Sequence, residues 1–383
     1  MADGWRRGAL LIAAIVAFGG LYLRIVGAPS PRGFAMPQAA ARPAAAPFFR
    51  PQFIPNSTAQ SVHSATAVAI SGGRLRAFWF GGSREGAPDV AIYTSVYSPA
   101  PGRWSPERVV MTRETLQRAL QRYVRKLGNP VAGRDRNGRL WLFFVSVSVG
   151  GWSGSAINLM VSEDEGETWS PPRRLIASPF LNISTLVKGP PLQFADGAIG
   201  LPVYHEMLGK FGELLRLDAD GRPVRKIRLS WGRSSLQPVI VPRSETEAVG
   251  FLRSPGDPPR WVQMVRTTDG GAHWSSPVKT ALPNPDSAVS GVLLGNGALL
   301  LAFNDSQDDR ENLSLAISAD YGNTWRIAHR VEGDPASPQA PIREYSYPWI
   351  MQDRAGDIHL LYTWGRSRIK HVRFNPAWLG RAR

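Results

Sequence analysis

The stretch Ser162-Glu163-Asp164-Glu165-Gly166-Glu167-Thr168-Trp169 decides the fold, because its pattern occurs three times along the chain. The other copies are Thr267-Thr268-Asp269-Gly270-Gly271-Ala272-His273-Trp274 and Ser318-Ala319-Asp320-Tyr321-Gly322-Asn323-Thr324-Trp325. Each copy places Ser or Thr, Asp, Gly and Trp at the same offsets. These residue types predict a tight hairpin turn in which Asp bonds backbone amides, Gly takes a positive φ and Trp anchors the loop in a core. Copies in register predict a repeat protein.

A second pattern has a longer period and predicts the number of repeats. A turn followed by a β-rich apolar strand recurs six times, at residues 73–80, 138–144, 197–203, 247–252, 297–303 and 356–362. A spacing of roughly 50 to 65 residues suits four-stranded propeller blades, whereas a β-sandwich would lack this period. The sequence therefore predicts an all-β, six-bladed β-propeller over residues 51–383, with Phe48–Phe53 supplying the outermost strand of the last blade.

One segment departs from the β pattern. Leu116, Leu120 and Val124 recur at intervals of four within Thr112–Lys126, among Arg and Gln residues. This spacing predicts a helix that is inserted into the propeller and packs on it.

Composition limits the class of function. The chain has 383 residues, a net charge of +15 and no cysteine. A basic chain favours acidic partners, namely nucleic acid, anionic lipid headgroups or acidic sugars. No Arg/Lys run and no nucleic-acid motif occurs, so nucleic acid is not expected as a partner. The lack of cysteine excludes disulfides and thiolate metal sites. No nucleotide loop or metal-ligand cluster is present either, so no cofactor and no metal are implied.

The N-terminal segment predicts export. Arg6 and Arg7 precede the apolar run Gly8–Leu23, and Val26-Gly27-Ala28 offers a cleavage site that Arg24 disturbs. Residues 1–28 are therefore a signal peptide or an uncleaved anchor, and the body is expected to be periplasmic or membrane-anchored and facing outward. Membrane contact is expected only through residues 8–26. Residues 29–50 are an Ala/Pro-rich linker, and the propeller is expected to be a monomer.

The innermost strands of a propeller begin at one end of its central channel, so polar residues there converge on one pocket. Counting about ten residues back from each turn identifies these positions as His63, Asn129, Lys188, Gln237, Asn284 to Ser287, and Tyr347. All are polar although each introduces an apolar strand. They are either an active site or a ring of polar side chains that solvates the channel.

The repeated octamer resembles the Asp-box of the sialidase-like superfamily (neuraminidases and other BNR-repeat proteins), and the resemblance extends from about Pro51 to the end. It implies an exo-acting glycosidase that hydrolyses a terminal acidic sugar, sialic acid or a related one, from a glycan. Members of this superfamily hold the substrate carboxylate with three arginines and use a Tyr nucleophile, a carboxylate partner and an Asp acid/base. A neutral Tyr suits a substrate whose own carboxylate would repel a carboxylate nucleophile.

The resemblance assigns roles to four residues. Tyr347, in Tyr347-Pro348-Trp349-Ile350, corresponds to the nucleophile, and Asp89 lies in the first-blade loop that holds the acid/base. Arg253 ends a strand like the second arginine of the family, and Arg310 precedes a strand and an Asp-box like the third. The remaining candidates are Glu85 as a catalytic group and Arg84, Lys188, Asn129 and Trp152 as substrate-binding groups. Trp152 could stack on a sugar ring or belong to the core.

Two positions depart from the family pattern. His63-Ser64-Ala65 stands where sialidases carry Arg-Ile-Pro, and Gln237 stands where Glu normally partners the Tyr. Glu206 or Glu85 would then have to supply the missing base, or His63 acts as an acid or base of its own. Three functions stay open: the acidic-sugar glycosidase, a uronate-glycan lyase on the same fold, and a non-catalytic propeller that binds acidic sugars.

Overall fold

The computed structural model describes residues 8–13, 16, 33–36, 46–178, 182–333 and 344–380. The chain divides into two compact units, Met1–Arg32 and Gly33–Arg383. Most of the segment predicted to direct export lies outside the described residues. Among the residues that are described, no helix is long and apolar enough to cross a bilayer.

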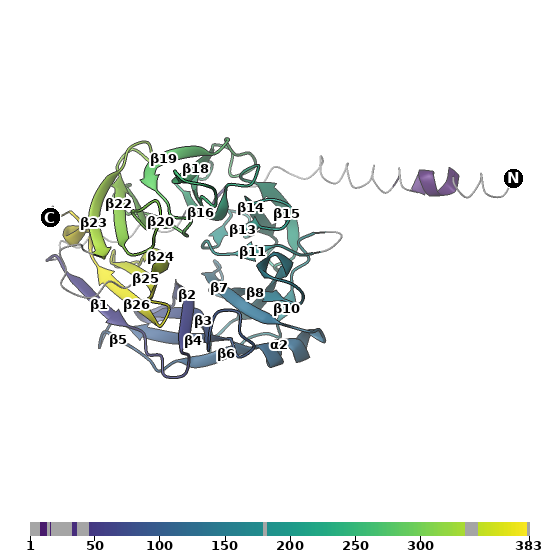
Figure 1. Cartoon of the computed structure of the whole chain (residues 1–383), viewed down its shortest axis with the longest axis horizontal. Coiled ribbons are helices and arrows are strands. Elements are labelled where there is room, and N and C mark those ends of the chain that lie inside the picture. The colour runs from purple at the N-terminus through teal and green to yellow at the C-terminus, as the bar shows by residue number, and fades with distance from the viewer. Residues whose placement is uncertain are drawn as a thin grey trace. The chain divides into compact units, whose positions relative to one another are not determined.

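The described part of Gly33–Arg383 forms six antiparallel sheets around a central axis (Figure 1). The first sheet contains β2 (Ser61–Ala69), β3 (Leu75–Gly82), β4 (Ala91–Ser98), β5 (Arg103–Trp104) and β6 (Arg108–Thr112). The second contains β7 (Lys126–Arg134), β8 (Leu140–Val147), β9 (Ser155–Ser162) and β10 (Arg173–Arg174). The third contains β11 (Leu186–Val187), β12 (Leu192–Gln193), β13 (Ile199–His205), β14 (Phe211–Leu217) and β15 (Pro223–Arg228).

The other three sheets complete the ring. The fourth sheet contains β16 (Leu236–Pro242), β17 (Ala248–Arg253), β18 (Trp261–Thr267) and β19 (Val278–Pro283). The fifth contains β20 (Ser290–Leu293), β21 (Leu299–Phe303), β22 (Leu313–Ser318) and β23 (Arg326–Glu332). The sixth contains β24 (Tyr345–Gln352), β25 (Ile358–Trp364), β26 (Arg368–Phe374) and β1 (Phe49–Phe53). A short helix, α3 (Pro376–Leu379), follows the last strand. The predicted all-β, six-bladed propeller is confirmed.

The ring closes within its last blade. β1 pairs antiparallel with β26, with Phe49 opposite Phe374 and Phe53 opposite Lys370. This confirms that Phe48–Phe53 supplies the outermost strand. Because the N-terminal strand and the C-terminal strands share one sheet, the ring cannot open without breaking a hydrogen-bonded ladder.

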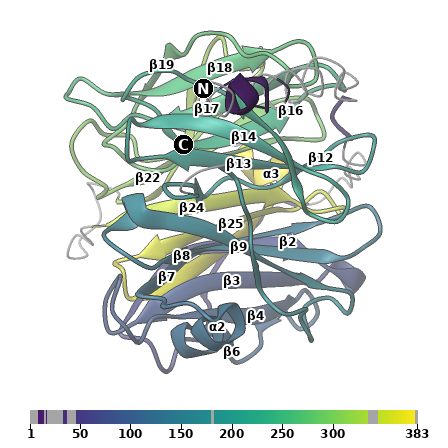
Figure 2. The same cartoon turned by 90° about the vertical axis from the view of Figure 1, so that its right-hand side faces the viewer.

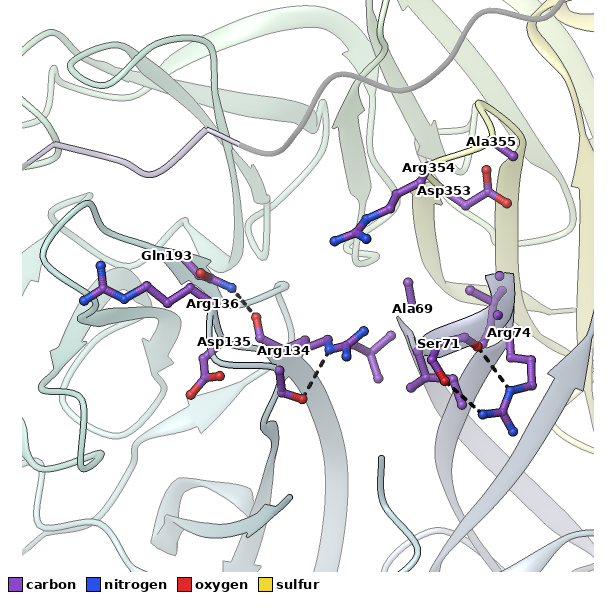
Figure 3. Close-up of a pocket in the computed structure, with 16 residues that line it drawn as sticks. Ala69, Ser71, Arg74, Arg134, Asp135, Arg136, Gln193, Asp353, Arg354 and Ala355 are labelled. Carbon is purple, nitrogen blue, oxygen red and sulfur yellow. Dashed lines mark hydrogen bonds between the residues drawn. The ribbon is translucent and has the colours of Figure 1, made fainter. Parts of the chain in front are cut away.

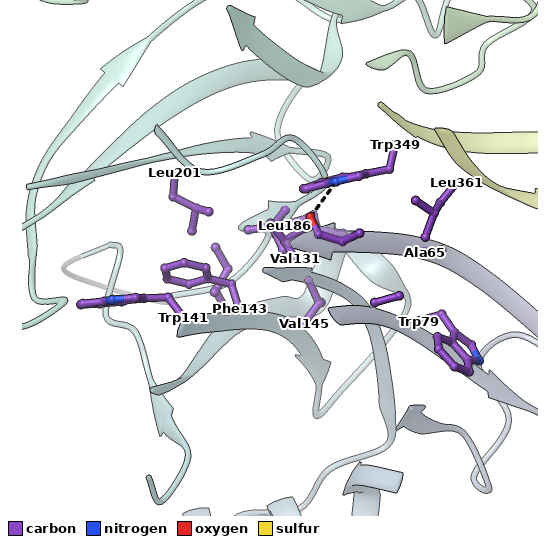
Figure 4. Packing of buried hydrophobic residues seen from close by; sticks show 14 of the residues in the cluster. Ala65, Trp79, Val131, Trp141, Phe143, Val145, Leu186, Leu201, Trp349 and Leu361 are labelled. Atoms are coloured by element: carbon purple, nitrogen blue, oxygen red, sulfur yellow. Dashed lines mark hydrogen bonds between the residues drawn. The ribbon is translucent and has the colours of Figure 1, made fainter. Parts of the chain in front are cut away.

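Both faces of the inner strands are buried, which explains why these strands are almost continuously apolar, whereas outer strands such as β15 and β19 are partly exposed. Every residue of β8 is buried. Large aromatic side chains fill the space between blades, among them Trp141, Phe143 and Trp349 (Figure 4). The indole Nε1 of Trp349 donates to the Ala67 carbonyl oxygen at 2.9 Å, which links the last blade to the first.

The three Asp-box turns have the predicted geometry. In the first, the Ser162 hydroxyl donates to the Asp164 carboxylate at 2.7 Å and accepts the Gly166 amide at 2.7 Å. The Asp164 carboxylate also accepts the Thr168 amide at 2.9 Å, and Gly166 has φ 91°. The Trp169 ring then packs edge-on against Phe78 of the preceding blade, with 5.8 Å between ring centroids. Each turn therefore ties two blades together.

The inserted helix is shorter than the predicted Thr112–Lys126. α2 covers Arg113–Leu120, with the Thr112 hydroxyl accepting the Thr115 amide as an N-cap. Gln121 adopts a left-handed conformation with φ 47°, which ends the helix. Val124 is buried as the pattern required, but it lies in the connection between α2 and β7. The helix itself lies beside β4 and β6 (Figure 2).

Residues 33–36 dock on the propeller although the sequence places them in a linker. Phe34 is fully buried and stacks on Phe194, with 5.4 Å between the ring centroids. Its amide donates to the Glu245 carbonyl oxygen at 2.7 Å, and the Ala35 amide donates to the Gln193 carbonyl oxygen at 2.8 Å. One phenylalanine in an Ala/Pro-rich segment carries no periodic signal, so the pattern could not reveal this contact.

Candidate functional site

Each blade contributes at least one left-handed residue in or just before its innermost strand. These residues are Ser64, Asn129, Ser184, Gln237, Asp286 and Tyr347, with φ between 44° and 59°. Four of them coincide with a register shift between the first and second strands of their blades. A bulge of this kind turns a side chain out of the normal alternation. A left-handed conformation is costly for Ser, Gln and Tyr, whereas Asn and Asp tolerate it, and such conformations cluster at functional sites.

Tyr347 and Gln237 form the centre of a buried hydrogen-bond network. The Gln237 amide nitrogen donates to the hydroxyl oxygens of Tyr347 at 3.0 Å and Tyr204 at 3.2 Å. Arg253 donates to the Gln237 carbonyl oxygen at 3.1 Å, and Asn129 donates to the Tyr204 hydroxyl at 3.3 Å. Because the Arg253 guanidinium binds the side-chain carbonyl oxygen of Gln237, the side-chain amide nitrogen of Gln237 faces the hydroxyl groups of Tyr347 and Tyr204. Gln237 therefore cannot accept a proton from Tyr347.

Two predicted arginines converge on Asp286. Arg253, the last residue of β17, donates through Nε to the Asp286 carboxylate at 2.5 Å. Arg310 donates to the Asp286 main-chain oxygen at 2.8 Å. Burial works to lower the pKa of Arg253, but Tyr347 and Asp286 raise it above its ordinary value. Arg253 is therefore a cation, and Asp286 holds both arginine side chains in place.

A third arginine, which the sequence did not predict, lies in the last blade. Arg366 follows β25 and donates to the carboxylates of Glu344 and Glu85, each at 2.5 Å. Glu344 also accepts from Arg310 at 3.3 Å, so it links two of the guanidinium groups. Burial favours a higher pKa for Glu344, yet hydrogen bonds from Arg366 and Ser346 bring it below the ordinary value. Glu344 is therefore ionised and orients both arginines.

His63 lies at the point where these cations converge. Its ring is 4.2 Å from the ring of Tyr347, centroid to centroid. Burial lowers the pKa of His63 well below its ordinary value, and the cationic groups Arg366, Arg310, Lys188 and Arg253 lower it further. The imidazole is therefore neutral at pH 7. Its Nδ1 atom is buried and has no hydrogen-bond partner within the described part of the chain.

Lys188 is a buried ammonium beneath the same site. Its side chain is almost fully buried, and Nζ donates to the Pro348 carbonyl oxygen at 3.3 Å. Nζ lies 5.4 Å from the centre of the Tyr347 ring and 5.5 Å from the centre of the Trp349 ring. Burial lowers the pKa of Lys188 to about 7.

The first-blade loop contributes less directly. Both carboxylate oxygens of Asp89 accept from Ser83, at 2.8 and 2.9 Å. Burial favours a higher pKa for Asp89, but the bonds from Ser83 lower it overall. Asp89 and Arg84 are exposed, and no contact joins either to Tyr347 among the described residues. Glu85, by contrast, reaches the site through Arg366.

Trp152 lies beside the site on its second-blade side. It packs over Gly128, where an added side chain would come within 2.6 Å of the indole. The Lys126 ammonium lies 5.5 Å from the centre of its ring. Gly128 directly precedes Asn129, so Trp152 lies next to the residue that bonds Tyr204. Its half-buried ring leaves both a packing role and a sugar-stacking role as predictions.

Glu206 is a further carboxyl group near these residues. Burial raises the pKa of Glu206, Arg253 and Lys210 oppose that rise, and Asp286 adds to it. The sequence indicated Glu206 only as a substitute base. Arg366, Glu344, Asp286 and Tyr204 were not predicted as individual site residues. One signal for Arg366 was present, because it follows the second strand of its blade just as Arg253 ends the second strand of its own.

Residues 73–360 match the BNR repeat-like domain, and the chain belongs to this family. The predicted membership of the sialidase-like BNR superfamily is confirmed. No curated protein matches the sequence.

Several solved structures share the fold. The Hadza microbial sialidase Hz136 is 17% identical with a TM-score of 0.66, over 82% of this chain and 65% of that one. The NanB sialidase from Streptococcus pneumoniae is 12% identical with a TM-score of 0.69, over 85% and 70%. The GH93 alpha-L-arabinofuranosidase of Fusarium graminearum is 12% identical with a TM-score of 0.59, over 84% and 95%. The chain thus spans just under two thirds of Hz136. At these identities the likeness establishes the fold, and the named enzymes act on different sugars.

Proposed function

We propose that the protein is an exo-acting glycosidase that removes a terminal acidic sugar, sialic acid or a related one, at the channel mouth around Tyr347. One observation carries this proposal. Arg253, Arg310, Arg366 and Lys188 come from four different blades, and all four act electrostatically on the buried His63. A site that gathers cations around a neutral phenol fits a substrate whose reacting carbon carries a carboxylate.

The arginines keep N–H groups for a ligand. A guanidinium has five N–H donors in a rigid fork, and Asp286, Glu344 and Gln237 occupy only some of them. These bonds fix the planes of the guanidinium groups before the substrate arrives. Binding a carboxylate then costs little side-chain entropy.

Tyr347 is the proposed nucleophile. Its oxygen would form a bond to the anomeric carbon as the glycosidic bond breaks, and its proton must leave. Gln237 cannot take that proton, so neutral His63, whose ring lies 4.2 Å from the Tyr347 ring and whose Nδ1 has no partner among the described residues, is the proposed acceptor. The leaving oxygen needs a proton donor. Asp89 is the donor that the family resemblance implies, and Glu206, whose pKa burial raises, is the alternative.

A uronate-glycan lyase is the second candidate, and the His63–Tyr347 contact favours it. A neutral imidazole next to a phenol suits removal of a proton beside a carboxylate, with the phenol protonating the leaving oxygen. The orientation of Gln237 favours a third outcome, in which the site binds acidic sugars without turnover.

Product analysis separates these candidates. The protein is incubated with sialyllactose and with a uronate-terminated oligosaccharide. Release of the free acidic sugar supports hydrolysis, an unsaturated product that absorbs in the ultraviolet indicates elimination, and binding without products indicates a lectin. Either of the last two results would overturn the glycosidase.

Two variants test the site directly. Arg253→Ala removes a buried charge-assisted contact and should weaken binding of the acidic sugar by about 2–5 kcal/mol. Tyr347→Phe should abolish turnover while the ligand still binds. Arg326→Ala and Tyr123→Phe, at exposed positions, are the matched controls and should behave like the wild type. Full turnover by Tyr347→Phe would remove Tyr347 from the mechanism.

We also propose that the propeller acts outside the cytoplasm. The pair Arg6 and Arg7 before the apolar run Gly8–Leu23 supports this location. Cell fractionation tests it, and recovery of the full-length protein as a soluble cytoplasmic species would contradict it.

A further inference from the structure

A cavity lies where the innermost strands β2, β7 and β24 end (Figure 3). It has a volume of about 680 Å³ and is lined by the turns that follow β2, β7 and β24, together with Gln193. Tyr347 lies near the start of β24, and Asp353 follows its end. Asp353 is six residue steps along the chain from Tyr347, which corresponds to roughly 20 Å of extended strand. The cavity is therefore separate from the proposed catalytic site.

Arginines from three blades line this cavity. Arg74 comes from the first blade, Arg134 and Arg136 from the second, and Arg354 from the sixth. The guanidinium groups of Arg134 and Arg354 project toward the same opening (Figure 3). Arg354 is exposed and makes no hydrogen bond or ion pair in the part of the chain that the structure describes. An anion bound between these two like charges would offset their repulsion.

The carboxylates of the lining do not provide that anion, because they are already bonded elsewhere. Asp135 accepts from Arg139 at 2.7 Å and from the Trp141 indole at 3.0 Å. Asp353 accepts from the His359 ring at 3.1 Å and from the Asp357 amide at 2.9 Å.

Glu165, near the edge of the cavity, is shared between two arginines. It contacts Arg74 at 2.9 Å and lies 3.6 Å from Arg134. This leaves Arg136 and Arg354 without a carboxylate partner among the described residues. The cavity therefore carries a net positive charge.

The entry point of the chain lies beside this cavity. The Ala35 amide donates to the Gln193 carbonyl oxygen, and Gln193 lines the cavity. Phe34 anchors the same segment in the core. Residues 33–36 therefore lie next to the arginine-lined cavity.

We propose that this cavity is a second binding site, which holds a phosphate group of a lipid headgroup or of a soluble phosphate ester. The arginines approach from turns of three blades, and a tetrahedral dianion accepts hydrogen bonds from several directions at once, whereas a carboxylate offers two oxygens in one plane. Guanidinium groups bind phosphate oxygens in pairs.

Isothermal titration of the full chain with inorganic pyrophosphate tests the site. The paired variant Arg134→Gln/Arg354→Gln should raise the dissociation constant at least tenfold. The control pair Arg222→Gln/Arg326→Gln, at exposed positions elsewhere, changes the net charge equally and should raise it less than twofold. Arg354→Gln alone removes no described contact, so a weaker affinity in that variant cannot come from misfolding.

Equal losses in the test and control pairs would overturn the site, because they would show attraction to net charge alone. Loss of pyrophosphate binding in Arg253→Ala but not in Arg354→Gln would also overturn it, because the anion would then occupy the Tyr347 mouth.

Vesicles identify the source of the phosphate. Full-length wild type and the Arg134→Gln/Arg354→Gln variant are sedimented with vesicles of phosphatidylcholine, with and without phosphatidic acid. Both carry residues 1–28, so that segment contributes equally. If phosphatidic acid increases the fraction of protein that sediments with the vesicles for the wild type only, the phosphate belongs to a lipid headgroup. If the sedimented fraction increases equally for the wild type and the variant, the lipid headgroup is excluded as the source of the phosphate, and a soluble phosphate ester remains.

Discussion

Replacing Lys188 by Met should stabilise the propeller at acidic pH and lose that advantage as the pH rises. Burial lowers the pKa of Lys188 from 10.5 to about 7 in the folded protein. Below pH 7 the ammonium is charged in both the folded and unfolded states, so folding bears the full cost of burying it. Met is unbranched, has a similar length and carries no charge to desolvate.

The magnitude follows from the difference between the two pKa values. It is about 3.5 pH units, and at 1.36 kcal/mol per unit this corresponds to a ceiling of about 5 kcal/mol. The faces of Tyr347 and Trp349 offset part of the cost, because each cation–π contact in a desolvated setting contributes about 1–2 kcal/mol. We therefore expect Lys188→Met to raise the free energy of unfolding by about 2 kcal/mol at pH 6.

The pH dependence gives the sharper test. Between pH 7 and 10.5 the unfolded chain binds a proton at Lys188 that the folded chain has released. The wild type therefore gains stability over that window by up to about 1.4 kcal/mol per pH unit, and the variant does not. Urea unfolding of both proteins at pH 6, 7, 8 and 9 measures the difference, since groups common to both largely cancel. A difference that stays constant with pH, or a variant that is less stable at pH 6, would refute the assignment of Lys188 as an uncompensated buried cation.

Two further substitutions test how the ring is held together. Phe34→Ala should lower the free energy of unfolding by about 3 kcal/mol, because it removes a fully buried ring. An unchanged urea midpoint would contradict this prediction and show that residues 33–36 detach before the propeller unfolds. Trp349→Phe should cost about 1–3 kcal/mol in thermal unfolding, because the Ala67 carbonyl oxygen loses its indole donor between the last and first blades, and an unchanged Tm would contradict that link.

The sequence predicts the propeller because the information that builds it is local. All the hydrogen bonds that shape an Asp-box turn lie within eight residues, from Ser162 to Trp169 in the first copy. Because the side chains of this short motif form the hydrogen bonds that its own backbone needs, the turn can be predicted without knowledge of the rest of the chain. The same holds for the inner strands, whose polar first residues interrupt apolar runs at a regular spacing. That spacing alone places His63, Gln237 and Tyr347 at one mouth of the channel.

The parts that the sequence did not predict depend on contacts between distant blades. Asp286, Glu344 and Arg366 act on residues of other blades, and nothing in their local sequence names their partners. The helix α2 ends at Gln121 because the chain must become a strand by Lys126, where the next blade begins. The spacing of apolar residues does not contain this constraint. Phe34 lacks a pattern altogether because its partners come from two other blades.

The replacement of the family arginine by His63 looks, from sequence alone, like the loss of one third of the carboxylate clamp. The structure gives it a different meaning, because Arg366 enters the same region from the last blade and is held there by Glu344 and Glu85. A fourth guanidinium, at position 63, would then face three others and Lys188 in a buried space, at a high electrostatic cost. A histidine that these same cations keep neutral avoids that cost and leaves an unprotonated nitrogen beside Tyr347. The departure at His63 is therefore compatible with the cationic groups around the mouth, and under the proposed mechanism His63 takes the place of Gln237 as the proton acceptor.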